Sequence, residues 1–255
     1  MSQNQIPNPY SSNPASPTAP ATPAGPLSPA SPSALGVKPD ARLAAAFLSQ
    51  AFLWMFAGLL VTAGVAFVVT TNERLLEFAS GSFFLLFIAQ LVIVVAISAG
   101  INRISATAAL GLFFVYAASL GITIGLIVAS YTTGSVVTAF LSASAMFGAA
   151  AVYGAVTKRS LAGLGGILFM GLIGLLVAMV LNIFLQSTQI TWIISIIGVV
   201  IFTALTAYDV QRIQAGDLAA QTGSMEKAAV IGALHLYLDF INIFLFMLRL
   251  FGGRN

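Results

Sequence analysis

The chain has 255 residues, of which 59% are hydrophobic and 7% are charged, and its net charge is +3. A soluble domain carries about a quarter charged residues, so the composition excludes an ordinary soluble protein and predicts one embedded in a membrane. The small positive charge is spread over short polar segments, which argues against nucleic-acid binding. Without cysteine and with one histidine, the chain can form neither a disulfide nor a thiolate or multi-histidine metal site. We expect no cofactor.

The first 40 residues differ from the rest of the chain. All ten prolines lie within the first 39 residues, and the first charged residue is Lys38. Residues 1–37 are rich in Pro, Ser, Ala and Thr and hold few large apolar side chains, so they cannot bury enough surface to offset the entropy of ordering. The sequence therefore predicts a disordered cytoplasmic tail over residues 1–40, most simply a solvated tether, and one transmembrane domain over residues 41–255.

Seven apolar runs follow, each long enough to cross about 30 Å of hydrocarbon as a helix of about 20 residues. They cover approximately residues 43–70, 82–102, 106–130, 135–157, 161–185, 190–214 and 229–250. A transmembrane barrel would show short alternating segments instead. The predicted fold class is an all-α membrane protein with seven transmembrane helices. The connections, including residues 71–81 and 215–227, are short, so successive helices are expected to be antiparallel neighbours.

Lysine and arginine predict the orientation, because they are enriched in cytoplasmic connections. A cytoplasmic amino terminus places seven of the ten basic residues inside and three outside. We therefore expect a multi-pass protein of the lipid bilayer with its amino terminus in the cytoplasm, most simply in a bacterial inner membrane. The charges alone leave open whether the seventh run spans the membrane or re-enters.

Asp239 interrupts the seventh apolar run near its middle. A carboxylate at this depth costs roughly 2.5–3.5 kcal/mol, so it is kept only when it faces the protein interior and has a partner. The candidate partner is Asp209, late in the sixth run, and Arg103 ends the second run at the same side of the membrane. Two carboxylates in a dry place cannot both ionise at low cost, so the pair is expected to share a proton and titrate as a unit.

The pair suggests two kinds of chemistry. Sharing the proton would hold the sixth helix to the seventh, and losing it would recruit a cation. Oxygen ligands suit a hard ion, so Asp209 and Asp239 could form a transient Ca²⁺ site, with Arg103 as the counter-ion in a closed form. The plainer alternatives are that Asp209 is a solvated residue of the membrane interface and that Arg103 only marks the cytoplasmic side. No nucleophile motif or binding cleft is readable, so we do not expect an enzyme.

Two further polar side chains lie near Asp239. His235 precedes it by four residues and shares its helical face, so it could relay a proton, although a lone histidine in an apolar helix is more often a packing residue. Asn242 follows within one turn and is expected to bond between helices. Both are possible modulators of the acid pair.

Two segments resemble the signatures of the Bax inhibitor-1 family, also called transmembrane Bax-inhibitor-motif proteins. Residues 202–213, FTALTAYDVQRI, resemble the sixth-helix signature, and residues 233–245, ALHLYLDFINIFL, resemble the seventh. The seven-run layout matches throughout, and the proline-rich tail lies outside the resemblance. The short segment INRIS around Arg103 is a weaker match to the family's arginine at the end of the second helix.

The resemblance implies a fold in which a central seventh helix is wrapped by the other six. It also implies a pH-sensitive calcium leak whose two motif aspartates, here Asp209 and Asp239, share a proton. His235 departs from the family pattern, because its position is usually small and polar. The eukaryotic relatives suppress cell death, and a bacterial relative is associated with a membrane-bound protease.

We therefore predict a passive Ca²⁺ leak channel gated by protonation of the acid pair. A proton-coupled secondary transporter is the second hypothesis, although no inverted repeat is visible. The third is a regulatory protein that binds a membrane protease or another membrane partner. Flux that requires a proton gradient would favour the second, and co-purification of a partner with function surviving loss of both acids would favour the third.

Overall fold

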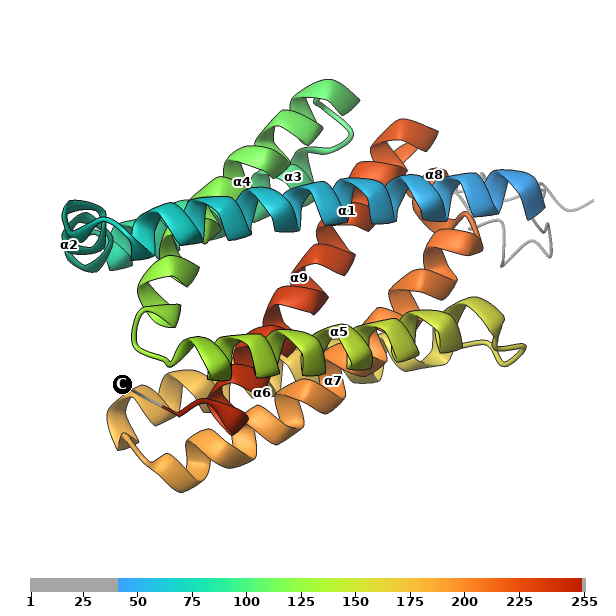
Figure 1. Ribbon diagram of the computed structural model, residues 1–255. Helices are drawn as coiled ribbons and strands as arrows, with labels where there is room; N and C mark the ends of the chain where they lie inside the picture. Colours follow the sequence, from blue (N-terminus) through green and yellow to red (C-terminus); the bar gives the residue numbers. More distant parts are fainter. Residues whose placement is uncertain (1–40, 254–255) are drawn as a thin grey trace, which may run out of the picture.

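The computed structural model describes residues 41–253, so the predicted tail over residues 1–40 lies outside the described residues. The described part is helical (Figure 1), with elements in the order α1 (Ala41–Thr70), α2 (Glu73–Gly81), α3 (Phe83–Gly100), α4 (Ala106–Val128), α5 (Thr133–Val156), the 3₁₀ turn η1 (Ala162–Leu164), α6 (Gly165–Leu185), α7 (Thr188–Gln214), α8 (Asp217–Thr222) and α9 (Met225–Phe251). Seven of these helices are long and apolar enough to cross a membrane: α1, α3, α4, α5, α6, α7 and α9. The predicted fold class is confirmed.

Two short helices occupy segments that the sequence had suggested were only connections. The side chain of Asn72 begins α2 by accepting hydrogen bonds from the backbone N–H groups of Arg74 and Leu75. Helix α8 is bounded by Gly216 and Gly223, whose φ angles of 76° and 63° lie in the left-handed region that favours glycine. Both helices therefore depend on their caps and turns rather than on a long apolar run.

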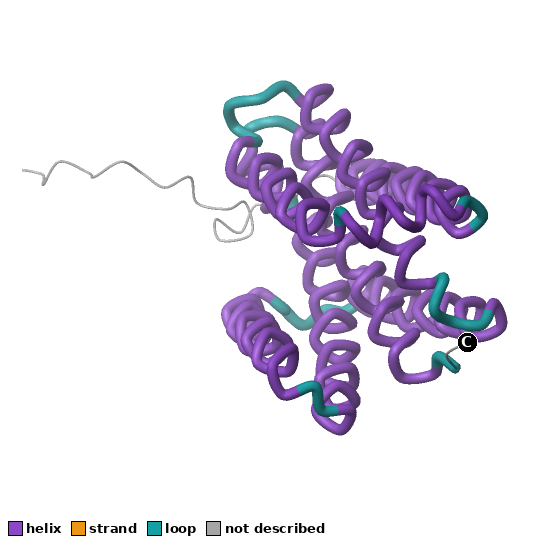
Figure 2. The backbone as a smooth tube through the Cα atoms, turned by 90° about the vertical axis from the view of Figure 1, so that its left-hand side faces the viewer, coloured by secondary structure: helices purple, strands orange, loops and turns teal. Residues whose placement is uncertain are grey.

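Helix α9 is the centre of the molecule. It crosses obliquely between α1 and α4 on one side and α5 and α7 on the other, and it packs against all four (Figures 1 and 2). In the most apolar part of α9, 78% of the residues are buried, against 11% in α3 and 6% in α6. Helices α3 and α6 form an outer layer, since α3 packs mainly on α4 and α6 mainly on α7. The predicted central seventh helix is confirmed, and the apolar outer faces are those that lipid would cover.

Helix α9 runs from one end of the bundle to the other. It begins beside α8, and its far end is held to the connection between α4 and α5, where the N–H of Thr132 donates to the carbonyl of Gly253 (3.1 Å) and the N–H of Gly253 donates to Ser135 Oγ (2.8 Å). The seventh helix therefore crosses the bundle completely rather than re-entering.

The middle of α9 is fixed by a buried hydrogen-bond chain. Thr62 of α1 donates to the carbonyl of Ala117 in α4 (2.9 Å), and its Oγ1 lies 2.6 Å from the hydroxyl of Tyr237. Because the only hydroxyl proton of Thr62 is used on Ala117, the hydroxyl of Tyr237 is the donor in the second bond. The ring of Tyr237 is fully buried and packs edge-on against Phe113 and Tyr116. This chain joins α1, α4 and α9.

Replacing Tyr237 with phenylalanine should lower the stability of the bundle by about 0.5–1.5 kcal/mol, because the variant loses one buried hydrogen bond while Thr62 keeps its bond to Ala117. Thermal unfolding of the purified protein in detergent would measure the change. The matched control is Tyr153→Phe, because Tyr153 is 51% exposed and its replacement should leave the midpoint unchanged. Equal thermal midpoints for Tyr237→Phe and Tyr153→Phe would contradict the assignment of Tyr237 as the donor of a stabilising hydrogen bond to Thr62.

Candidate functional site

The candidate site lies where α7 meets α9. Asp209 on α7 is 7% exposed and Asp239 on α9 is 4% exposed, and their carboxyl groups interact electrostatically. Asp209 is therefore a buried residue rather than a solvated one at the membrane interface. The structure brings together the two acids that the sequence had paired.

The residues on either side of Asp209 fix the position of α7. The backbone of Ala207 approaches Gly154 of α5 so closely that a Cβ at Gly154 would overlap the Ala207 carbonyl. Gln211 accepts a hydrogen bond from the N–H of Leu161 (2.7 Å) and donates to the carbonyl of Arg159 (2.9 Å). The link between α5 and α6 is thus tied to α7 one half-turn beyond the acid, so Asp209 sits on a helix held from two sides.

One carboxylate oxygen of the pair is left without a partner. Oδ2 of Asp239 is fully buried and has no hydrogen-bond partner among the described residues. A buried carboxylate oxygen without a donor costs free energy comparable to a lost charged hydrogen bond, unless a proton or a cation occupies it. The carboxylate oxygen without a partner therefore belongs to the more deeply buried of the two acids.

One threonine of the site, Thr206, was not found from the sequence, nor was Thr203, which lies one turn before it on α7. Thr206 lies within hydrogen-bond reach of the Asp239 carboxyl and donates its own proton to the carbonyl of Phe202 (2.8 Å). The buried Oγ1 of Thr203 has no partner among the described residues. Thr203, Thr206 and Asp209 follow one another at intervals of three, which places them on one helical face. This spacing was the signal in the sequence that could have identified both threonines.

His235 joins the pair from α9. Its Nδ1 lies 3.5 Å from Oδ1 of Asp209, within ion-pair distance, although no aligned hydrogen bond is formed. The imidazole therefore approaches the acid on the facing helix, α7, as well as sharing a helical face with Asp239.

The structure does not bring Arg103 to the site. Arg103 lies exposed in the turn between α3 and α4, and within residues 41–253 no ion pair joins it to either acid. Helix α3 packs on α4 rather than on α7, which accounts for this separation. Its role as a closed-state counter-ion stays a prediction. Asn242 donates to the carbonyl of Leu238 in its own helix (2.8 Å), so the bond between helices that we expected from it is not formed.

The pair is not a complete metal site in this arrangement. Over the described residues, the structure holds no group of three or more His, Asp or Glu side chains placed to bind a metal ion. Asp209 and Asp239 supply oxygen atoms of the kind that Ca²⁺ prefers, but a bound ion would also need carbonyl groups or water to reach six or more ligands.

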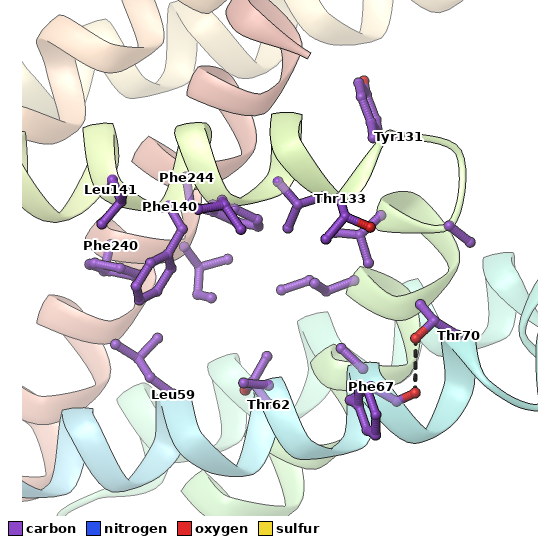
Figure 3. Close-up of a pocket in the computed structure, with 18 residues that line it drawn as sticks. Leu59, Thr62, Phe67, Thr70, Tyr131, Thr133, Phe140, Leu141, Phe240 and Phe244 are labelled. Carbon is purple, nitrogen blue, oxygen red and sulfur yellow. Dashed lines mark hydrogen bonds between the residues drawn. The ribbon is translucent and has the colours of Figure 1, made fainter. Parts of the chain in front are cut away.

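A cavity of about 630 Å³ lies between α1, α4, α5 and α9 (Figure 3). Its walls are mainly apolar, with Leu59 on α1, Phe140 on α5 and Phe240 and Phe244 on α9. None of the residues that line it is charged. The cavity offers a cation only a few hydroxyl and carbonyl oxygens, and Phe240 in its wall directly follows Asp239 in the chain.

The fold and the site define a class of protein: a bundle of seven membrane-length helices with a pair of buried acids between the central helix and α7. Residues 44–255 match the family described as inhibitor of apoptosis-promoting Bax1. The chain therefore belongs to the Bax inhibitor-1 family of membrane proteins, and the resemblance seen in the two signatures is confirmed.

Several bacterial relatives cover more than four fifths of the chain. It is 41% identical over 227 residues to "Inner membrane protein YbhL" of Escherichia coli (strain K12), which spans 86% of this chain and 96% of that protein. It is 40% identical over 210 residues to a protein of Deinococcus radiodurans, covering 82% of this chain and 91% of that one. A protein of Borreliella burgdorferi is 41% identical over 214 residues, with 82% and 92% covered.

Proposed function

We propose that this protein is a passive, pH-sensitive leak pathway for Ca²⁺ in which Asp209 and Asp239 form the gate. The observation that carries the proposal is the buried Oδ2 of Asp239, which has no partner in the described structure although a second carboxyl group lies beside it. A shared proton at this position holds α7 against α9. When the proton leaves, two negative charges remain in a dry site and require a cation.

The two acids lie on different helices, so a change in their charge can move one helix relative to the other, as a gate requires. Protonation changes the attraction between α7 and α9 directly, because one acid is carried by each. Helix α9 also contacts α1, α4 and α5, so a movement of α9 relative to α7 would also alter its packing against these three helices. A change at the acid pair would in this way reach both ends of the bundle.

We further propose that the α8 end of the bundle faces the cytoplasm and that the membrane is a bacterial inner membrane. Among the described residues, six basic side chains lie at this end and two at the other: Arg42, Arg103, Lys158, Arg159, Arg212 and Lys227 against Arg74 and Arg249 (Figure 1). The relative from Escherichia coli is named as an inner membrane protein.

Ca²⁺ uptake into liposomes that hold the purified full chain tests the proposal. We expect uptake above that of empty liposomes, without a proton gradient, and with a rate that changes between pH 5.5 and 8. Uptake only in the presence of a proton gradient would contradict the leak and favour a coupled transporter. Uptake equal to that of empty liposomes at every pH would also contradict it, and would favour a regulatory role toward a membrane partner.

A further inference from the structure

The cavity between α1, α4, α5 and α9 is apolar inside and polar at one end. Leu59 and Phe240 lie at its inner end, whereas Thr70, Tyr131 and Thr133 lie at the other, where α1 ends and α5 begins (Figure 3). This polar end is opposite to α8, because α9 crosses the bundle from α8 to the connection between α4 and α5. The cavity therefore runs from the middle of the bundle to one of its ends.

The length of the cavity matches one leaflet of a membrane. Along α1 it extends from Leu59, near the middle of the span Ala45–Thr70, to Thr70 at the end of that span. This part of α1 rises by about 16 Å, and half of a hydrocarbon core of about 30 Å is about 15 Å. A lipid acyl chain has to cover the same distance, from the headgroup region to the midplane of the bilayer.

The cavity is open at the side of the bundle that lipid would cover. Helices α1 and α5 do not pack extensively against each other, although both pack against α9, which crosses between them (Figure 1). Phe67 on α1 and Leu141 on α5 line the cavity, and they are 69% and 63% exposed. A chain from the surrounding lipid can therefore enter sideways between α1 and α5.

The inner part of the cavity suits hydrocarbon better than water or an ion. A buried water needs two to four polar partners. The hydroxyl group in this part is that of Thr62, which is already bonded to the carbonyl of Ala117 (2.9 Å) and to the hydroxyl of Tyr237 (2.6 Å). The volume of about 630 Å³ lies within the range of about 300–1,000 Å³ that holds small-molecule ligands.

We propose that this cavity binds one acyl chain of a membrane phospholipid, from the leaflet on the side opposite α8. The end of the chain packs on Leu59 and Phe240, and the headgroup lies at the polar end, where the hydroxyl of Thr133 can donate to an ester carbonyl. A free fatty acid fits less well, because its carboxylate would lie at a rim whose lining residues include no cation. The site is separate from the acid pair and does not depend on ion flux.

The preference for this site over bulk lipid comes from packing. A chain that moves from the bilayer into the cavity leaves one apolar medium for another, so it gains little from the hydrophobic effect. It gains dispersion contacts with walls that are fixed in place, including the aromatic rings of Phe140, Phe240 and Phe244. A side chain that fills the space should therefore prevent binding.

Photo-cross-linking of the purified full chain in detergent tests the proposal. The probe is a trace of phosphatidylethanolamine with a diazirine near the end of one acyl chain, and mass spectrometry of the peptides locates the label. We expect the label to concentrate around Leu59 and Phe240, in excess over α6, which has a widely exposed apolar surface. Even labelling of α1, α6 and α9 would overturn the proposal.

Ala63→Phe fills the cavity from α1. Ala63 lines the cavity and is exposed, so the phenyl ring enters the space without replacing a packed side chain. The label around Leu59 and Phe240 should fall about fivefold or more, because two groups cannot occupy the same volume. Val137→Phe fills the cavity from α5 and should have the same effect.

Ala89→Phe is the matched control. Ala89 is exposed on α3, outside the cavity and about as far from the end of its helix as Ala63 is from the end of α1, so the label should stay at the parent level. Thermal unfolding shows which variants keep the fold. Labelling at the parent level in either cavity-filling variant that keeps the fold would overturn the proposal.

Competition identifies the occupant. An excess of unlabelled phosphatidylethanolamine should remove the label, and the same concentration of palmitate should not. Displacement by palmitate alone would overturn the assignment to a phospholipid. If the label is absent from the cavity and light scattering shows a dimer, a second copy of the chain covers this space and the proposal is wrong.

Discussion

Asp239→Asn is expected to remove the pH dependence of Ca²⁺ flux. An amide cannot ionise, so the contact between α7 and α9 no longer depends on the loss of a shared proton. The ratio of the Ca²⁺ flux rates at pH 8 and pH 5.5 should therefore fall to about one. Asp209→Asn removes the other half of the pair and should have the same effect. Proteoliposome assays of both variants over the same pH series would measure it.

The control variant must keep both the fold and the two acids, Asp209 and Asp239. Asp217→Asn removes a carboxyl group on α8, at the same end of the molecule, and should keep the pH profile of the parent protein. Thermal unfolding of each variant shows whether the fold is retained. If both aspartate variants keep the parent profile, the proton-sharing gate is wrong even if the protein conducts Ca²⁺.

Gly154→Ala should destabilise the bundle by about 1–3 kcal/mol, because the added methyl group meets the backbone of Ala207 rather than a side chain that could turn away. Helix α5 would have to move from α7, which would also loosen the support of Asp209. The expected result is a thermal midpoint lower by several degrees, about 5 °C for a loss in this range.

Gly148→Ala is the matched control on the same helix. A Cβ at Gly148 meets no atom within 4 Å, so only helix propensity changes, and alanine is favoured over glycine there by about 0.5–1 kcal/mol. We expect an unchanged or slightly higher midpoint. A similar loss in both variants would contradict the close approach of α5 and α7.

The seven spans could be predicted because a helix that crosses lipid needs a long apolar run, and such runs are read directly from the chain. The two short helices could not, since α2 depends on the cap at Asn72 and α8 on the backbone of Gly216 and Gly223. Both segments contain charged residues and were interpreted as connections. Element ends were also displaced, as where α9 begins at Met225 rather than near residue 229.

The meeting of Asp209 and Asp239 could be predicted because a buried acid needs a partner and the chain offers few. The position of Arg103 away from the acid pair could not be predicted. Short connections make neighbouring helices antiparallel, but they do not say on which side of the central helix each one packs. Helix α3 lies against α4 in the outer layer, and this places Arg103 away from α7. From the sequence, His235 was related only to Asp239 on its own helix, and the structure also places it 3.5 Å from Asp209 on α7.

The central position of α9 has a consequence for assembly. The ribosome makes a chain from its amino terminus, so the six surrounding spans emerge before the helix that fills the space between them. Until α9 arrives, α5 and α7 lack their main packing partner, and α1 and α4, which pack mainly against each other, lack a further one. Asp239 then enters a slot already lined by protein, including Thr206 and Asp209, and avoids the cost of a carboxyl group facing hydrocarbon. Biogenesis in this order lets the helix that carries a carboxyl group near its middle become the best-buried one.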